Sequence, residues 1–263
     1  MQKTYISIRN YILWQRVPAG QIQFKELKAE TGLLSAYAIL YIISAYVIGQ
    51  IITNFPMPLL GATEFIQDFW YSVIYKIILL LLIPGLIYFY RWGYQFKDLL
   101  YGLRPTFKNI SATIAFGLSG FLLNANHLQR IENVLNNFED APLRLALGIL
   151  MPLFVAAIPE ELFFRAFLQT RLEKNQNRLI AILISTLLFT LWHLPSRYLL
   201  STGTEGHAGD WISVIIHTGI PVFFVGLFFA LHWSRYRNII FLIAVHWSID
   251  ILPSVSSYFK ILL

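Results

Sequence analysis

The sequence contains no cysteine, and only 13% of its 263 residues are charged. The missing thiols exclude disulfides, thiolate zinc sites and a cysteine nucleophile. Soluble domains usually carry about 25% charged residues, whereas 57% of the residues here are hydrophobic. The chain also lacks internal repeats, low-complexity stretches and linkers that would mark a second domain. These absences argue against a water-soluble globule and favour one continuous bundle.

Seven apolar runs follow residues 1–32, a segment that mixes charged and apolar side chains. Most of the runs are long enough to cross about 30 Å of hydrocarbon as helices. The runs cover residues 33–52, 70–90, 109–126, 143–169, 179–194, 211–231 and 239–259. We therefore expect an all-α, polytopic transmembrane helix bundle of about seven spans, with N-terminal helices over residues 33–142 and C-terminal helices over residues 143–263.

Basic residues alternate along the connections between these runs, and lysine and arginine are retained in cytoplasmic loops. The N-terminal segment and the second, fourth and sixth connections hold Lys3, Arg9, Arg16, Lys25, Lys28, Arg91, Lys97, Arg104, Lys108, Arg171, Lys174, Arg178, Arg235 and Arg237. The pattern predicts a cytoplasmic N-terminal segment and an external C-terminus. It also accounts for the formal net charge of +6, so we expect the lipid bilayer as a partner and no nucleic acid.

Two adjacent acids and an arginine lie in the fourth run, where ionisable side chains are costly and mark either a function or a structural pair. At helical spacing Glu161 and Arg165 share a face and can form a structural ion pair. Glu160 points about 100° away from them and needs another partner. Because an unpaired acid is better suited to proton transfer than a paired one, Glu160 is the candidate acid–base residue.

His193 closes the fifth run just before Pro195, where we expect the helix to end or bend. A lone histidine at a helix end is ordinarily a packing or capping residue. However, Glu160 and His193 are equally far along the chain from the polar turn at residues 174–177. In an antiparallel hairpin such residues lie at equal depth, so we expect Glu160 and His193 to face each other.

The last two runs contain two further groups of interest. Phe223, Gly226 and Ala230 form a small-residue pattern that is typical of close helix packing, and hairpin symmetry places Gly226 opposite His246. His246 and Asp250 are spaced i and i+4, so they share one helix face. Their hydrogen bond could be structural only, or it could complete a site with the acid and the histidine of the preceding hairpin.

Together these groups provide a carboxylate close to a histidine, and a second histidine with a polar neighbour. The first pair could deprotonate a water molecule and protonate a leaving amine, and the second could stabilise an oxyanion. A zinc ion on Glu160, His193 and His246 is conceivable, but the chain has no HExxH helix and no thiolate. We therefore favour peptide hydrolysis without a cofactor.

The remaining ionisable residues carry less weight. His127, His207 and His232 fall at expected interfaces or loops, where we expect them to be solvated. His217 lies near the outer end of the sixth run and could make a polar contact to the site. Lys76, inside the second run, is interpreted as a packed or water-facing charge.

The four polar groups resemble the motifs of the CAAX protease and bacteriocin-processing enzyme family, which are intramembrane endopeptidases. The motifs are EExxxR as Glu160, Glu161 and Arg165, FxxxH as Phe189 and His193, FxxGxxx(G/A) as Phe223, Gly226 and Ala230, and Hxxx(N/D) as His246 and Asp250. They occur in family order over residues 159–250, and the N-terminal half of the chain contains no matching motif.

The resemblance implies three roles: water activation by Glu160 and His193, an oxyanion hole from His246 and Asp250, and positioning of the site by Glu161 and Arg165. The best-understood prenyl-protein enzymes of the family have asparagine at the position of Asp250. An ionised aspartate cannot donate a hydrogen bond to an oxyanion. Asp250 is therefore either protonated or only orients His246, and the substrate need not be prenylated.

We thus expect an intramembrane endopeptidase of a bacterial plasma membrane that cleaves a membrane-associated peptide or protein. The alternative is a non-catalytic membrane regulator or scaffold that uses the same bundle to bind a membrane partner protein. A transporter would require paired discontinuous helices and symmetry between the halves, which the sequence lacks. Loss or survival of function in a Glu160→Gln variant separates the first two hypotheses.

Overall fold

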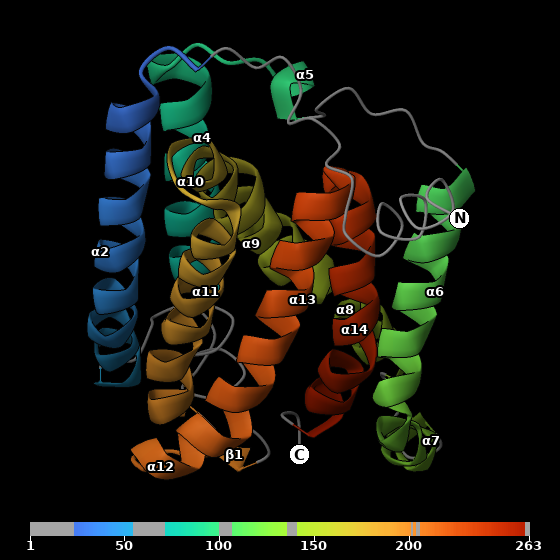
Figure 1. The fold of residues 1–263 in the computed structure, drawn as a ribbon. Coiled ribbons are helices and arrows are strands. Elements are labelled where there is room, and N and C mark those ends of the chain that lie inside the picture. Colours follow the sequence, from blue (N-terminus) through green and yellow to red (C-terminus); the bar gives the residue numbers. More distant parts are fainter. Residues whose placement is uncertain are drawn as a thin grey trace.

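The computed structural model describes residues 24–54, 72–99, 107–135, 141–200, 202–203 and 206–260. Within these ranges the protein is a bundle of helices with one very short strand pair (Figure 1), as the all-α prediction required. The strands β1 (Thr202–Gly203) and β2 (Gly206–His207) pair antiparallel next to helix α12. The predicted segment over residues 1–32 lies mostly outside the described residues.

Several long helices combine α-helical turns with wider π-helical turns or 3₁₀ turns, which carry the label η. In chain order the helices are α2 (Leu27–Asn54), η1 (Ser72–Leu82), α4 (Ile83–Leu86), η2 (Ile87–Arg91), α5 (Phe96–Leu99), α6 (Phe107–Leu123), η3 (Ala125–His127), α7 (Leu128–Leu135), α8 (Ala141–Pro152), η4 (Leu153–Ala157), α9 (Ile158–Glu160), η5 (Glu161–Gln169), α10 (Thr170–Asn175), α11 (Arg178–Leu200), α12 (Trp211–Val214), η6 (Ile215–Gly219), α13 (Ile220–Tyr236) and α14 (Ile239–Lys260). The π-helical turns are of interest because such turns occur frequently at functional sites.

Six described helices are long and apolar enough to cross a membrane: Leu27–Ile51, Val73–Arg91, Ala141–Asn175, Arg178–Leu200, Trp211–Tyr236 and Ile239–Ser256. They match six of the seven predicted runs, and the chain is therefore a polytopic integral membrane protein. The third run forms α6, whose described apolar stretch is only Ile110–Leu123. At 1.5 Å per residue this stretch is shorter than about 30 Å of hydrocarbon. The direction in which the chain crosses the membrane stays a prediction.

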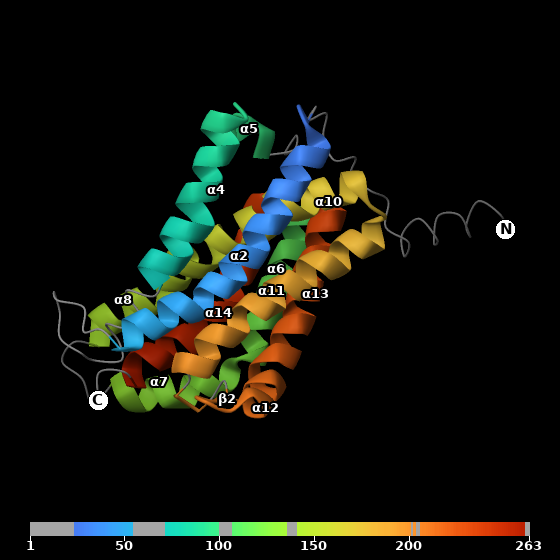
Figure 2. The ribbon, with the colours of Figure 1, turned by 90° about the vertical axis from the view of Figure 1, so that its left-hand side faces the viewer.

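The 35-residue helix Ala141–Asn175, here called the central helix, crosses the bundle diagonally from α8 to α10 (Figure 2). The other long helices pack around it. α11 lies between α2 and α13, α14 packs against α6 and α8, and η1 packs against α9. As a result, η1, α11 and α14 all approach the middle of the central helix, where the predicted acids lie.

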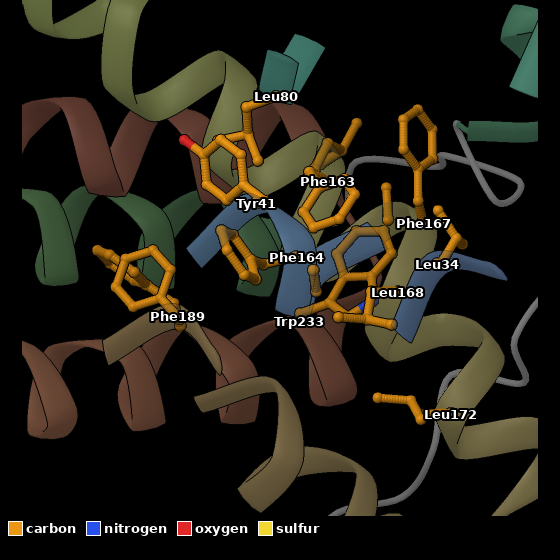
Figure 3. Packing of buried hydrophobic residues seen from close by; sticks show 14 of the residues in the cluster. Leu34, Tyr41, Leu80, Phe163, Phe164, Phe167, Leu168, Leu172, Phe189 and Trp233 are labelled. Atoms are coloured by element: carbon orange, nitrogen blue, oxygen red, sulfur yellow. The ribbon is translucent and has the colours of Figure 1, made fainter. Parts of the chain in front are cut away.

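The core beside the central helix is strongly aromatic (Figure 3). Phe163 and Phe164 lie edge to face with ring centroids 5.1 Å apart, and Phe164 contacts Phe189 of α11 in the same way at 5.4 Å. All three rings are buried. Because lipid tails are as apolar as these side chains, tight packing between surfaces must hold such helices together. Interlocking rings supply that packing immediately next to the predicted site.

Two local expectations are not met as stated. α11 does not end at Pro195 but continues to Leu200, because transmembrane helices tolerate an internal proline when their surroundings compensate for the missing donor. A bend at Pro195 stays a prediction. Gly226 does not face His246. A Cβ atom at Gly226 would lie 2.7 Å from Cδ1 of Phe189, so the small residue allows α13 to approach α11 rather than α14.

Candidate active site

Glu160 occupies the last residue of α9, immediately before the wide turns of η5. Its Oε1 lies 3.2 Å from the Nζ of Lys76 on η1. Its Oε2 lies 3.9 Å from Nε2 of His193 on α11 and 3.8 Å from Nε2 of His246 on α14. Three helices that are distant in sequence therefore direct a basic side chain at one carboxylate.

The facing arrangement of Glu160 and His193 agrees with the prediction from hairpin symmetry, although the role of the two residues stays a prediction. The Nδ1 atom of His193 lies 2.7 Å from the carbonyl oxygen of Phe189. A carbonyl can only accept, so Nδ1 carries the hydrogen and donates it. In the neutral ring Nε2 then has a free lone pair directed towards Glu160.

His246 lies between two carboxylates. Its Nδ1 is 2.8 Å from Oε1 of Glu161, and its Nε2 is 3.2 Å from Oδ2 of Asp250. The second contact is the i and i+4 pair that the sequence predicts. Only a doubly protonated imidazolium can donate from both nitrogens, so this arrangement suits a positively charged ring, which also stacks on Phe229 with centroids 4.5 Å apart.

The predicted pair of Glu161 and Arg165 is present and fully buried, with 3.6 Å between Oε2 and Nε. Arg165 also donates from Nη2 to the carbonyl oxygen of Gly226, over 3.2 Å. Its guanidinium lies 4.4 Å from the ring centroid of Phe189. Arg165 therefore connects the central helix to both α11 and α13, while Glu161 connects it to α14 through His246.

The site is sealed on one side and open on the other. The side chains of Glu160 and Glu161 are 2% and 0% exposed, whereas those of Asp250, Lys76 and His193 are 33%, 16% and 14% exposed. The exposed edge therefore runs along η1, α11 and α14. A molecule that reaches Glu160 has to approach from this edge.

Lys76 is the site residue that the sequence interpretation missed. It was expected to be a packed or water-facing charge, but its ammonium group contacts Glu160. The available signal was a lysine in an apolar run, because an ionisable residue inside a membrane usually has a partner and a function. The sequence could not identify the partner, because Glu160 lies 84 positions further along the chain.

The other histidines lie away from the site. His232 was expected to be solvated, but it is only 4% exposed, and the rings of Phe116, Phe228 and Tyr236 surround it. His217 is exposed, and its Nδ1 atom lies 2.9 Å from the carbonyl oxygen of Ser213, a residue outside the site. Of the other two, His207 is exposed as expected and His127 is partly buried.

Among the side chains that the structure describes, no group of three or more histidine, aspartate or glutamate residues has an arrangement that could hold a metal ion. Independence from a metal stays a prediction.

The fold and this cluster together define an integral membrane protein with acids and histidines gathered inside a helix bundle. The family model of the type II CAAX prenyl endopeptidase Rce1-like proteins matches residues 142–252. The match agrees with the resemblance drawn from the four motifs, and over this region the chain is similar to CAAX-protease-like membrane proteins. The matched region contains Glu160, His193, His246 and Asp250 but not Lys76. No curated protein and no solved structure matches the chain.

Proposed function

We propose that this protein is an intramembrane endopeptidase that hydrolyses a peptide bond in a membrane-embedded or membrane-associated peptide or protein. The observation that carries the proposal is the position of the Glu160 carboxylate. One of its oxygens lies within 4 Å of Nε2 of both His193 and His246, beside an edge that is accessible from outside the bundle. Proteases of the Rce1-like family supply the general precedent.

Glu160 and His193 are assigned to the activation of water. The 3.9 Å between Oε2 and Nε2 is longer than a hydrogen bond, and a water molecule that contacts both atoms fits beside such a pair. Glu160 takes a proton from this water as the new C–O bond forms. The same proton then passes to the amide nitrogen as the C–N bond breaks, so that Glu160 returns to its starting state.

His246 is assigned to stabilisation of the tetrahedral oxyanion. Its ring would carry a positive charge, with Nδ1 held by Glu161 and Nε2 lying 3.2 Å from Oδ2 of Asp250. The Nε2–H group would turn from Asp250 to the oxyanion as the negative charge develops there. An ionised Asp250 can only accept hydrogen bonds, so we assign it to orienting His246 and not to donating to the oxyanion. Removal of one oxyanion donor typically costs about 10²- to 10³-fold in rate. No cofactor is required for these steps.

The substrate enters along the exposed edge and is expected to be a membrane peptide or protein of a bacterial plasma membrane. Profiling of new peptide termini by mass spectrometry can identify it in cells that produce the wild-type protein or a Glu160→Gln variant. Glu132→Gln is the matched control, because it makes the same change at an exposed acid on α7. Termini that appear with the wild-type and Glu132→Gln proteins but not with Glu160→Gln support the proposal.

Two results would contradict the proposal. If purified and folded Glu160→Gln protein cleaves the identified substrate at the wild-type rate, Glu160 has no part in the mechanism. If no termini depend on Glu160 but a partner protein remains bound to the variant, the non-catalytic regulator becomes the better description.

A further inference from the structure

The two oxygens of Glu160 lie in different surroundings. Oε2 faces His193 and His246 at distances longer than a hydrogen bond. Oε1 accepts a hydrogen bond from Lys76 over 3.2 Å. Lys76 therefore occupies the oxygen that the proposed mechanism does not use, and it leaves the other oxygen free for water.

The charges around Glu160 balance only when Lys76 is included. The groups that face this carboxylate are Lys76 on η1, His193 on α11, and His246 and Asp250 on α14. The contacts of His193 suit a neutral ring. A protonated His246 already donates its hydrogens to Asp250 and to Glu161. A buried carboxylate without a counter-charge favours its protonated form, in which it cannot act as a base.

The formal charges of the four sequence motifs lead to the same conclusion. These motifs contribute the acids Glu160, Glu161 and Asp250 to the site, and Arg165 is their permanent cation. With a protonated histidine included, the motifs still carry one more negative than positive charge. The ammonium group from η1 removes this excess.

The position of Lys76 is fixed by aromatic side chains. Its Nζ lies 5.0 Å from the ring centroid of Trp192, which is almost completely buried. The neighbouring Tyr75 stacks on Tyr41 with centroids 4.2 Å apart, and it also contacts Trp192 at 5.9 Å. Attraction between a cation and an aromatic face adds to this placement. The lysine is therefore held at Glu160 instead of extending towards solvent.

We propose that Lys76, on a helix outside the family match, is a positioning residue that keeps the Glu160 carboxylate ionised and directs its free oxygen towards His193. This inference rests on the proposed function for its catalytic meaning. The charge relation between Lys76 and Glu160 can nevertheless be measured without a substrate.

The test is infrared spectroscopy of the purified, full-length protein in lipid nanodiscs at neutral pH, where a protonated carboxyl group gives a C=O stretching band distinct from that of a carboxylate. Lys76→Met removes the charge but retains the length of the side chain, and Lys76→Arg retains the charge. We expect a protonated-carboxyl band to appear in Lys76→Met and not in Lys76→Arg. The band should be absent from the double variant Lys76→Met/Glu160→Gln, which assigns it to Glu160.

Circular dichroism and thermal unfolding check that each variant is folded, and Lys76→Gln replaces Lys76→Met if the latter is not. A folded charge-removing variant without the band overturns the inference, and so does a band that persists in the double variant. Cleavage is the second readout. In Lys76→Met, the rate at which the Glu160-dependent termini form should fall by up to the roughly 10²- to 10⁴-fold expected for loss of a general base. Lys76→Arg should retain most of the wild-type rate. If the band appears but no cleavage is found in any form of the protein, the proposed function fails while the charge relation stands.

Discussion

Glu30 and Glu160 are both buried next to basic side chains, but their surroundings differ sharply. Glu30 of α2 is enclosed in what we call the anchor cluster, together with Tyr94 and Arg171. Arg171 Nε lies 2.7 Å from Oε2 of Glu30, and the Tyr94 hydroxyl donates to Oε1 over 2.7 Å. The anchor joins the first described helix to the end of the central helix. The guanidinium carbon of Arg171 also lies 4.8–5.4 Å from the centroids of four aromatic rings, those of Phe24, Tyr88, Trp92 and Tyr94.

Glu160 has looser contacts and an open edge. Among the described residues, only Lys76, at 3.2 Å, lies close enough to Glu160 for a hydrogen bond, and the two histidines lie 3.8 and 3.9 Å away. A carboxylate whose oxygens are already occupied by close donors has little capacity to take a proton, whereas one with a free oxygen near a histidine can do so. The comparison therefore indicates that an ion pair in the membrane interior is structural when it is closed and suited to reaction when it is partly open.

The largest expected effect concerns the open cluster. Glu160→Gln and His193→Ala should each lower the rate of substrate cleavage by about 10²- to 10⁴-fold, as for loss of a general base, and should leave the protein folded. If both residues act on one water molecule as proposed, the double variant should be little slower than either single variant. Rates of the purified variants measure this. Multiplicative losses would instead mean that the two residues act independently.

In the anchor cluster we expect a large effect on stability and none on the cleavage rate. Arg171→Met leaves Glu30 buried without its cation, which typically costs about 3–5 kcal/mol of stability. The free energy of unfolding in detergent micelles should fall by about this amount, while any folded protein should retain its cleavage rate. Equal loss of activity per folded molecule would show that the anchor acts on the site and would remove the distinction between the clusters.

Arg165→Ala should combine both effects, because Arg165 is sealed like the anchor but contacts the site. Its loss strands Glu161 in the interior at a cost of about 3–5 kcal/mol. Since Glu161 also holds His246, folded yield and cleavage should fall together. Normal thermal stability with unaffected turnover would contradict a positioning role for the pair.

Much of the local geometry was predictable because helices have a fixed period. The spacing of four residues placed Asp250 beside His246 and Arg165 beside Glu161, and both contacts are present. Hairpin symmetry placed Glu160 and His193 at equal depth because a short turn leaves two adjacent helices few alternatives. These predictions required only the rise of a helix and the position of one turn.

The predictions that failed depended on the choice of neighbours between distant helices. No periodicity indicates that η1 packs on α9, so the partner of Lys76 stayed unknown. The small residue Gly226 correctly indicated close packing, but it lies against Phe189 and not against His246. His232 is buried by rings from α6 and α13. In each case side-chain packing across several helices decides the outcome, and such packing cannot be derived from the pattern of one segment.

The smallest expected effect tests whether the Tyr94 hydroxyl of the anchor cluster is buried and hydrogen-bonded to Glu30. Tyr94→Phe removes the hydroxyl that donates to Glu30, and a hydrogen bond to a charged group contributes about 1.5–3 kcal/mol. Burial, followed by the hydrogen bond to Glu30, raises the pKa of Tyr94 from 10.0 to about 12. A group with a raised pKa in the folded state contributes its full stability below its unfolded pKa and loses it as the pH rises through the folded pKa. The difference in unfolding free energy between the wild-type and Tyr94→Phe proteins should therefore be constant below pH 10 and shrink towards pH 12, with cleavage per folded molecule unchanged. A difference that stays constant through pH 12 would mean that folding does not change the titration of the phenol, so that the phenol is not buried beside Glu30, and the anchor would then be as open as the site.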